Sequence, residues 1–69
     1  MESQKVTAYW NLYDMQTGQL LEPGRQIKGK SWPAIGELVI GIQDKMQAIV
    51  KDVRLKGIKN SLPEYDVYL

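Results

Sequence analysis

Apolar residues recur with a helical period across the middle of this 69-residue chain. Between positions 33 and 55, every position that a 3.6-residue period would place on one face of a helix is hydrophobic. A short chain has few segments from which to build a core, so this pattern constrains the fold more than any other feature. It predicts one long amphipathic helix whose buried face consists of Ile35, Leu38, Val39, Ile42, Met46, Ile49, Val50 and Val53.

The residues at the two ends of this pattern agree with a helix, whereas two internal glycines do not. Ser31 is a suitable N-cap, and Gly57 suits the left-handed position that follows a last helical turn. Gly36 and Gly41 each cost a helix about 1 kcal/mol relative to alanine. Residues 38–40, Leu-Val-Ile, suit a strand equally well. A kink or a late start is therefore compatible with the helix.

Strand patterns flank the expected helix on both sides. Residues 6–13 alternate between the two faces and are rich in aromatic and β-branched types, which is typical of a strand. Residues 14–18 begin with aspartate and end with glycine, as a hairpin loop requires, so a second strand is expected from Gln19. Pro23 predicts a bulge, an edge position or an early end in that strand. Residues 65–69 alternate again and predict a last strand.

These elements predict a single small α+β domain over residues 1–69, with residues 1–4 as a disordered N-terminus. The order is β-β-α-β, and the helix packs on a three-stranded, mainly antiparallel sheet. The alternative is a small five-stranded β-barrel in which residues 36–42 and 47–55 are also strands. In the first arrangement the inner face of the sheet consists of Val6, Ala8, Trp10, Leu12, Val67 and Leu69.

The composition narrows the classes of function. The chain contains no cysteine and no histidine, which removes disulfides, the usual zinc ligands and the commonest general base. We therefore expect no enzyme, no catalytic residue, no metal and no cofactor. The longest uninterrupted run of aliphatic residues is residues 38–40, and the first residues lack the apolar core of a signal peptide. These observations predict a cytoplasmic protein without membrane contact.

The distribution of charge is less even than the net charge of +1. Residues 23–60 contain eight lysines and arginines against three acids, whereas both ends are acidic. The basic residues near the expected helix end are favoured there by the helix dipole without any ligand. A net charge this small predicts no general affinity for nucleic acid or membranes.

Residues 24–31 match the spacing GxxxxGKS of a phosphate-binding loop. In such a loop Lys30 would reach the terminal phosphates and Ser31 would hold magnesium. That chemistry requires a parallel β-α-β fold with a second acidic motif, for which 69 residues with one helix leave no room. The interpretation we favour is a helix cap at Ser31.

Three tyrosines are the first candidate binding residues. If Trp10 and Val67 point into the core, then Tyr9, Tyr13 and Tyr68 share the opposite, open face of the sheet. Tyrosine is enriched at protein interfaces because it combines a large apolar area with a hydroxyl group. Tyrosine is also common on half-exposed strands that bind nothing, which is the simplest interpretation of any one of these residues.

The sequence therefore predicts a small, non-catalytic, cytoplasmic binding or regulatory module that acts through protein–protein contacts. A free sheet edge would also allow a homodimer. The alternative is a module for single-stranded nucleic acid, in which the tyrosines stack on bases. The phosphates would then be held by Arg25, Lys28 and Lys30.

Overall fold

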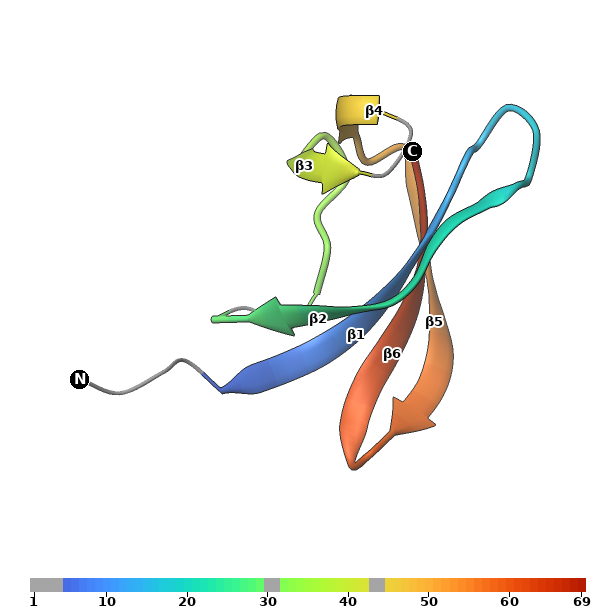
Figure 1. Cartoon of the computed structure of the whole chain (residues 1–69). Helices are drawn as coiled ribbons and strands as arrows, with labels where there is room; N and C mark the ends of the chain where they lie inside the picture. The colour runs from blue at the N-terminus through green and yellow to red at the C-terminus, as the bar shows by residue number, and fades with distance from the viewer. Residues whose placement is uncertain (1–4, 30–31, 43–44) are drawn as a thin grey trace.

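The computed structural model describes residues 5–29, 32–42 and 45–69, without the side chains of Lys45 and Met46. These residues form β-strands and no helix (Figure 1). The strands are β1 (Val6–Tyr13), β2 (Leu20–Lys28), β3 (Leu38–Ile42), β4 (Lys45–Ile49), β5 (Asp52–Lys59) and β6 (Leu62–Tyr68).

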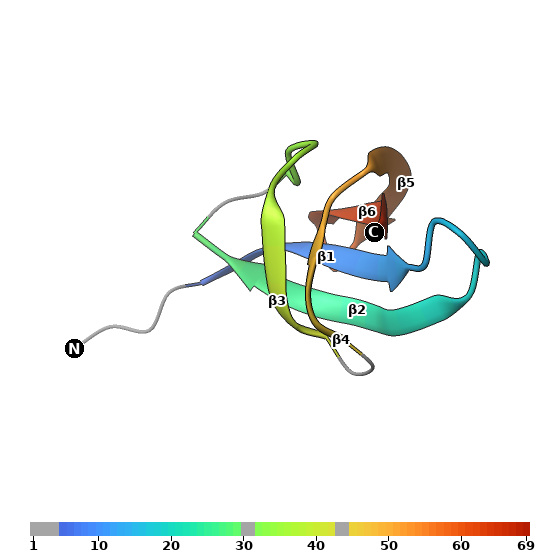
Figure 2. The same cartoon turned by 90° about the horizontal axis from the view of Figure 1, so that it is seen from above.

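The strands form two sheets. The larger sheet has the order β2-β1-β6-β5, in which the two outer pairs are antiparallel hairpins and the central pair, β1 and β6, is parallel. The smaller sheet is the antiparallel hairpin of β3 and β4. Figure 2 shows this hairpin crossing over one face of β1 and β2. The core lies between the two sheets, as in other two-layer β structures.

The hairpin of β1 and β2 agrees with its sequence pattern. Asp14 accepts a hydrogen bond from Gly18 N at 2.7 Å through its carbonyl, and from Gln16 N at 2.8 Å through its carboxylate. Gly18 has a φ of 77°, the left-handed conformation expected of the last loop residue. The register shifts where Pro23 passes Asn11, and β2 is an edge strand. The predicted bulge and edge position are both confirmed, although β2 continues to Lys28.

A two-residue turn joins β5 to β6. Asn60 and Ser61 have φ values of 52° and 65°. Positive φ at both central residues defines the type I′ turn, whose twist matches that of the flanking strands. As a result β6 begins at Leu62, three residues before the predicted start of the last strand.

The core consists of nine buried apolar residues from both sheets and the segments that join them. The predicted inner face of the sheet is confirmed except at Val6, which is half-buried. The β3–β4 hairpin and the segment after it supply three further core residues. The complete cluster is Ala8, Trp10, Leu12, Leu21, Val39, Ile42, Val50, Val67 and Leu69.

The predicted helix is wrong: residues 38–42, 45–49 and 52–59 are strands. Gly36 and Gly41 have φ values of 91° and 71°, which no α-helical residue adopts. The helical period therefore arose by coincidence from strands interrupted by turns. It also fails as a burial pattern, because Ile35, Leu38 and Ile49 are 69%, 50% and 45% exposed.

The α+β class is consequently wrong, and the described residues form an all-β protein with a mixed four-stranded sheet. The barrel alternative is right that residues 38–42 are extended, but six strands in two separate sheets replace its five-stranded barrel. Gly57 does not follow a helix; it pairs with Glu64 beside a register shift in β5. The predicted cap at Ser31 and the predicted disorder at residues 1–4 fall on positions outside the described residues.

Candidate functional site

The three tyrosines lie on the face of the four-stranded sheet that turns away from the core. Tyr13 and Tyr68 are directly opposite each other in the parallel pair of β1 and β6. Their rings stack, with centroids 5.2 Å apart and planes 21° from parallel. The guanidinium carbon of Arg54, on β5, lies 5.9 Å from the centroid of the Tyr68 ring. These two rings therefore already have partners within the chain.

Tyr9 lies nearer the other end of the same face, beneath the turn that joins β5 to β6. Asn60 donates a hydrogen bond from Nδ2 to the Tyr9 hydroxyl at 3.2 Å. The Nζ atom of Lys59 lies 5.2 Å from the centroid of the Tyr9 ring, within cation–π distance. Tyr9, Tyr13 and Tyr68 are all half-buried, so part of each ring is already covered within the chain and less of it is open to a nucleic acid base.

A polar network centred on Asn11 occupies the middle of this face. The Asn11 side chain is buried and donates from Nδ2 to Glu64 Oε2 at 2.8 Å and to Asp66 Oδ1 at 3.3 Å. Its Oδ1 accepts a hydrogen bond from Gly24 N at 2.8 Å. One side chain of β1 thus satisfies the backbone at the β2 bulge and both acidic residues of β6.

This network changes the ionisation of Glu64. The hydrogen bond from Asn11 lowers the pKa of the Glu64 carboxyl below its ordinary value, and the positive charges of Lys56 and Lys59 lower it further. Desolvation by burial opposes these effects and is outweighed. The Glu64 carboxylate is therefore held ionised, as an acceptor, by its neighbours in the sheet.

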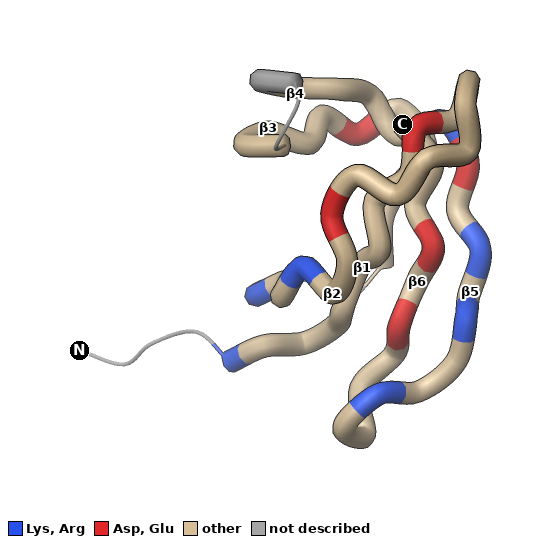
Figure 3. The backbone as a smooth tube through the Cα atoms, turned by 45° about the vertical axis from the view of Figure 1, so that its right-hand side comes forward, with Lys and Arg blue, Asp and Glu red and all other residues tan. Residues whose placement is uncertain are grey.

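Charges of opposite sign lie side by side on this face. Figure 3 shows lysine and arginine along β5 and acidic residues along β6. Arg54 Nε lies 3.6 Å from Asp52 Oδ2, and Lys56 Nζ lies 3.8 Å from Glu64 Oε2. A phosphate backbone laid on the tyrosines would meet carboxylates as well as cations, unlike the single-signed surface of a dedicated nucleic-acid module.

Of the three basic residues predicted to hold phosphates, Arg25 does not join the tyrosines. Arg25 is opposite Trp10 in the β1–β2 register and therefore lies on the core side of the sheet. Lys28 is exposed at the end of β2. Lys30 lies outside the described residues. The set predicted from the sequence is thus divided between two faces.

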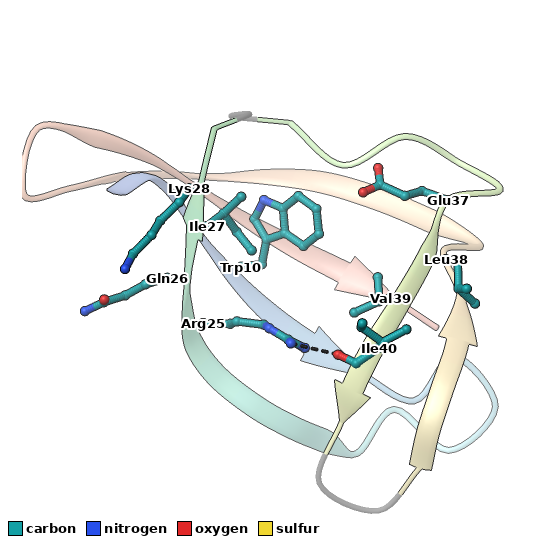
Figure 4. A pocket seen from close by; sticks show the side chains of 9 residues that line it. All are labelled: Trp10, Arg25, Gln26, Ile27, Lys28, Glu37, Leu38, Val39 and Ile40. Carbon is teal, nitrogen blue, oxygen red and sulfur yellow. Dashed lines mark hydrogen bonds between the residues drawn. The ribbon is translucent and has the colours of Figure 1, made fainter. Parts of the chain in front are cut away.

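A cleft of about 330 Å³ lies between β2 and β3. In Figure 4 the side chains of Trp10, Ile27 and Arg25 point from the larger sheet toward β3, whereas those of Gln26 and Lys28 point away from it. Arg25 crosses the cleft and donates from Nη2 to the backbone carbonyl of Ile40 at 2.7 Å. The complete lining is Trp10, Arg25, Gln26, Ile27, Lys28, Glu37, Leu38, Val39 and Ile40.

Exposed apolar side chains gather around β3. Of the nine large hydrophobic residues that are exposed in the described part of the chain, five belong to the β3–β4 hairpin and the segment before it. Single exposed apolar residues are normal, but Leu38, Ile40 and Ile49 share the face of the hairpin opposite the buried Val39, and Trp32 and Ile35 precede them in the chain. These five residues are named the hairpin surface below: Trp32, Ile35, Leu38, Ile40 and Ile49.

Sequence reasoning missed the hairpin surface because it assigned most of these residues to a helix core. The run Leu38–Ile42, Leu-Val-Ile-Gly-Ile, was the available indication. It carries no charge and is rich in β-branched residues, which favours a strand, and a strand exposes alternate side chains. The role of Arg25 in crossing the cleft leaves no comparable trace in the sequence.

The described residues contain neither a metal-binding cluster nor a membrane-spanning helix. No three acidic side chains there come close enough together to hold a metal ion. Nor does the described part of the chain contain a helix of the length and hydropathy needed to cross a membrane. The chain matches no protein family, no curated protein and no solved structure with which it was compared.

Proposed function

We propose that this protein is a small non-catalytic module that binds another protein through the hairpin surface. The observation that carries the proposal is the exposure of Trp32, Ile35, Leu38, Ile40 and Ile49 beside a cleft. Covering such side chains with a partner contributes about 25 cal/mol for each Å² of apolar surface removed from water. The surface differs from the one predicted from sequence, because the tyrosines already contact other residues of the chain.

The side chains that line the cleft favour a binding role over covalent catalysis. Its lining has no hydroxyl, thiol or imidazole group. It therefore lacks the serine, cysteine and histidine side chains that form the commonest nucleophile–base pairs. The expected location in the cytoplasm stays a prediction from the sequence.

The experiment compares three forms of the full chain as bait in extract of the source cells. In one variant Ile35→Ser and Ile40→Ser remove two side chains of the hairpin surface. The control variant carries Leu55→Ser and Ile58→Ser, which alter two β5 residues that are 65% and 71% exposed. Both pairs are exposed, so neither change is expected to cost the core contacts that a buried substitution would.

We expect a protein that is retained by the wild type and the control variant and at least about tenfold depleted with the hairpin variant. Quantitative mass spectrometry measures the ratio. A tenfold loss of affinity corresponds to about 1.4 kcal/mol of binding free energy. Burying two isoleucine side chains fully at an interface contributes more than this. Equal retention by all three forms would contradict the proposal.

Self-association is a further possibility that the same surface allows. If the partner is a second copy, light scattering after size-exclusion chromatography will give a mass that rises with concentration, and the hairpin variant will remain monomeric. A single-stranded nucleic acid partner has no specific observation in its favour, because Arg25 lies on the core side of the sheet and carboxylates lie among the tyrosines.

A further inference from the structure

The backbone of β3 has a free edge. Val50 N donates to Glu37 O. Leu38 and Ile49 are therefore a non-hydrogen-bonded pair of the antiparallel ladder. Two residues further on, Ile40 and Gln47 form a pair of the same kind. The N–H and C=O groups of Leu38 and Ile40 therefore point away from β4, toward β2. A strand can be added to an edge of this kind.

Arg25 already occupies one of these four groups. Its Nη2 donates to the carbonyl of Ile40, which is the bond that the N–H of an added strand would otherwise make. Among the described residues, the N–H and C=O of Leu38 and the N–H of Ile40 have no such partner. The free part of the edge thus runs from Leu38 to Ile40, and the Arg25 guanidinium marks its end.

The edges of the larger sheet are protected against strand addition, and β3 is not. β2 contains Pro23 with a bulge, and β5 has a register shift together with the cations Arg54, Lys56 and Lys59. Bulges, proline and edge lysines are the usual means of preventing edge-to-edge pairing. β3 has the sequence Leu-Val-Ile-Gly-Ile, without charge or proline.

The cleft next to this edge offers space for a side chain of an added strand. In Figure 4, Trp10 and Ile27 face Val39 across it. The opposite side of the edge carries the exposed Leu38 and Ile40. Because side chains of a strand alternate, one could enter the cleft while its neighbours lie on the hairpin surface.

The Arg25 guanidinium gives the cleft a charged end. Nη1 is buried and forms no hydrogen bond among the described residues, and it makes an ion pair with Glu22 Oε1 at 3.7 Å. A guanidinium has five N–H donors and binds carboxylates in a two-pronged geometry. Arg25 therefore retains donors for a carboxylate brought by the occupant.

We propose that the β3 edge binds an extended segment of the partner protein as an added strand, with an apolar side chain in the cleft and a carboxylate at Arg25. This proposal rests on the proposed function and names the partner's chemistry. The backbone groups of Leu38 and Ile40 supply the hydrogen bonds, and the cleft and Arg25 select the side chains.

The probe is a phage-displayed library of random peptides of about twelve residues, long enough to cover the edge and its flanks at about 3.3 Å per residue. Immobilised full chain selects from it, and fluorescence polarisation then measures the affinity of the synthesised peptides. We expect selected peptides to have alternating apolar residues followed or preceded by aspartate or glutamate.

Two substitutions test the backbone contact. Leu38→Pro removes the outward N–H at the first position of β3, where proline is tolerated, and Leu38→Ala removes the side chain but keeps the N–H. Peptide affinity should fall at least about tenfold further with Leu38→Pro than with Leu38→Ala. Thermal unfolding of each variant checks that it folds. Equal affinity for the two folded variants would overturn the proposal.

Arg25 provides a second test that leaves β3 unchanged. Arg25→Gln should weaken peptides that carry the acidic residue at least about fivefold, and it should not affect the same peptides with that residue replaced by glutamine. A loss that is equal for both peptides would show that Arg25 acts only by holding β3, which overturns the carboxylate site.

Two further outcomes separate this proposal from the proposed function. If the library yields no binding peptide while the Ile35→Ser, Ile40→Ser variant still loses its partner, strand addition is overturned and the proposed function stands. If the wild-type chain dimerises and Leu38→Pro abolishes the dimer, the occupant is a second copy, and the partner segment is overturned.

Discussion

At the scale of single residues, Asn11 connects more of the sheet than any other polar side chain described. It is the only buried polar residue among those described, and its amide has both donor and acceptor partners. An amide is the one side chain that can donate to Glu64 and Asp66 while accepting from Gly24 N. Its amide nitrogen donates to the two carboxylates on this face of β6.

Replacing Asn11 by aspartate should be strongly destabilising. Asn11→Asp substitutes a third carboxylate for the group that donates to Glu64 and Asp66. We expect a loss of about 2–3 kcal/mol or more in the free energy of unfolding at pH 7, shrinking at pH 3, where carboxylates are protonated. Urea titration followed by circular dichroism measures both values. A loss independent of pH would show that repulsion between carboxylates is not the cause.

The lowered pKa of Glu64 predicts how stability depends on pH. Because the folded-state pKa lies below the unfolded one, the contribution of Glu64 is complete above its ordinary pKa of about 4.3 and is lost as pH falls through the lowered folded value. Between pH 6 and pH 3 the wild type should therefore lose more stability than Glu64→Gln. Urea midpoints at the two pH values measure this, and equal losses would count against the shift.

At the scale of elements, the success of sequence reasoning depended on how local the determining contacts are. The β1–β2 hairpin was predictable because Asp14 and Gly18 bond within their own loop. The strands between residues 33 and 55 were not predictable, because the apolar residues of this segment satisfy a helical period. Only the contact of Val39 and Ile42 with the larger sheet favours strands over a helix. Tertiary packing there overrides a local periodic pattern.

The β5–β6 turn predicts a stabilising substitution. Ser61 has a φ of 65°, which costs a serine more than a glycine, and Asn-Gly is the preferred pair for a type I′ turn. Ser61→Gly should raise the free energy of unfolding by about 0.5–1 kcal/mol. Thermal or urea unfolding checks this value. Gly18→Ala tests the reverse change and should be destabilising. Gly18 has open space around it, so the only cost of an added Cβ is its φ of 77°.

At the scale of the whole molecule, the candidate site could not be derived from the sequence. The face of each tyrosine followed from alternation along its strand. The contacts that occupy the rings involve Arg54, Lys59 and Asn60, which reach them only through the pairing of β5 with β6 and of β6 with β1. The cleft likewise depends on how the two sheets pack, a relation that no local pattern encodes.

The mixed charges and occupied rings of the outer face predict weak interaction with nucleic acid. Titration of the protein with a mixed-sequence, single-stranded DNA of about 20 nucleotides at low salt should leave the tyrosine and tryptophan fluorescence unchanged at micromolar concentration. Binding that weakens steeply with added salt would show that phosphates are contacted and would contradict this expectation.

The parallel pairing of β1 with β6 has a consequence for synthesis of the chain. It pairs Asn11 with Asp66, 55 positions further along the chain. During translation β1 can meet β2 early, but its other neighbour reaches it only after residues 62–68 have left the ribosome. Until then the nascent chain consists of hairpins with uncovered apolar faces, which are marginally stable in water. Cooperative folding is therefore expected to begin after translation of β6, at the slow rate typical of proteins dominated by distant contacts.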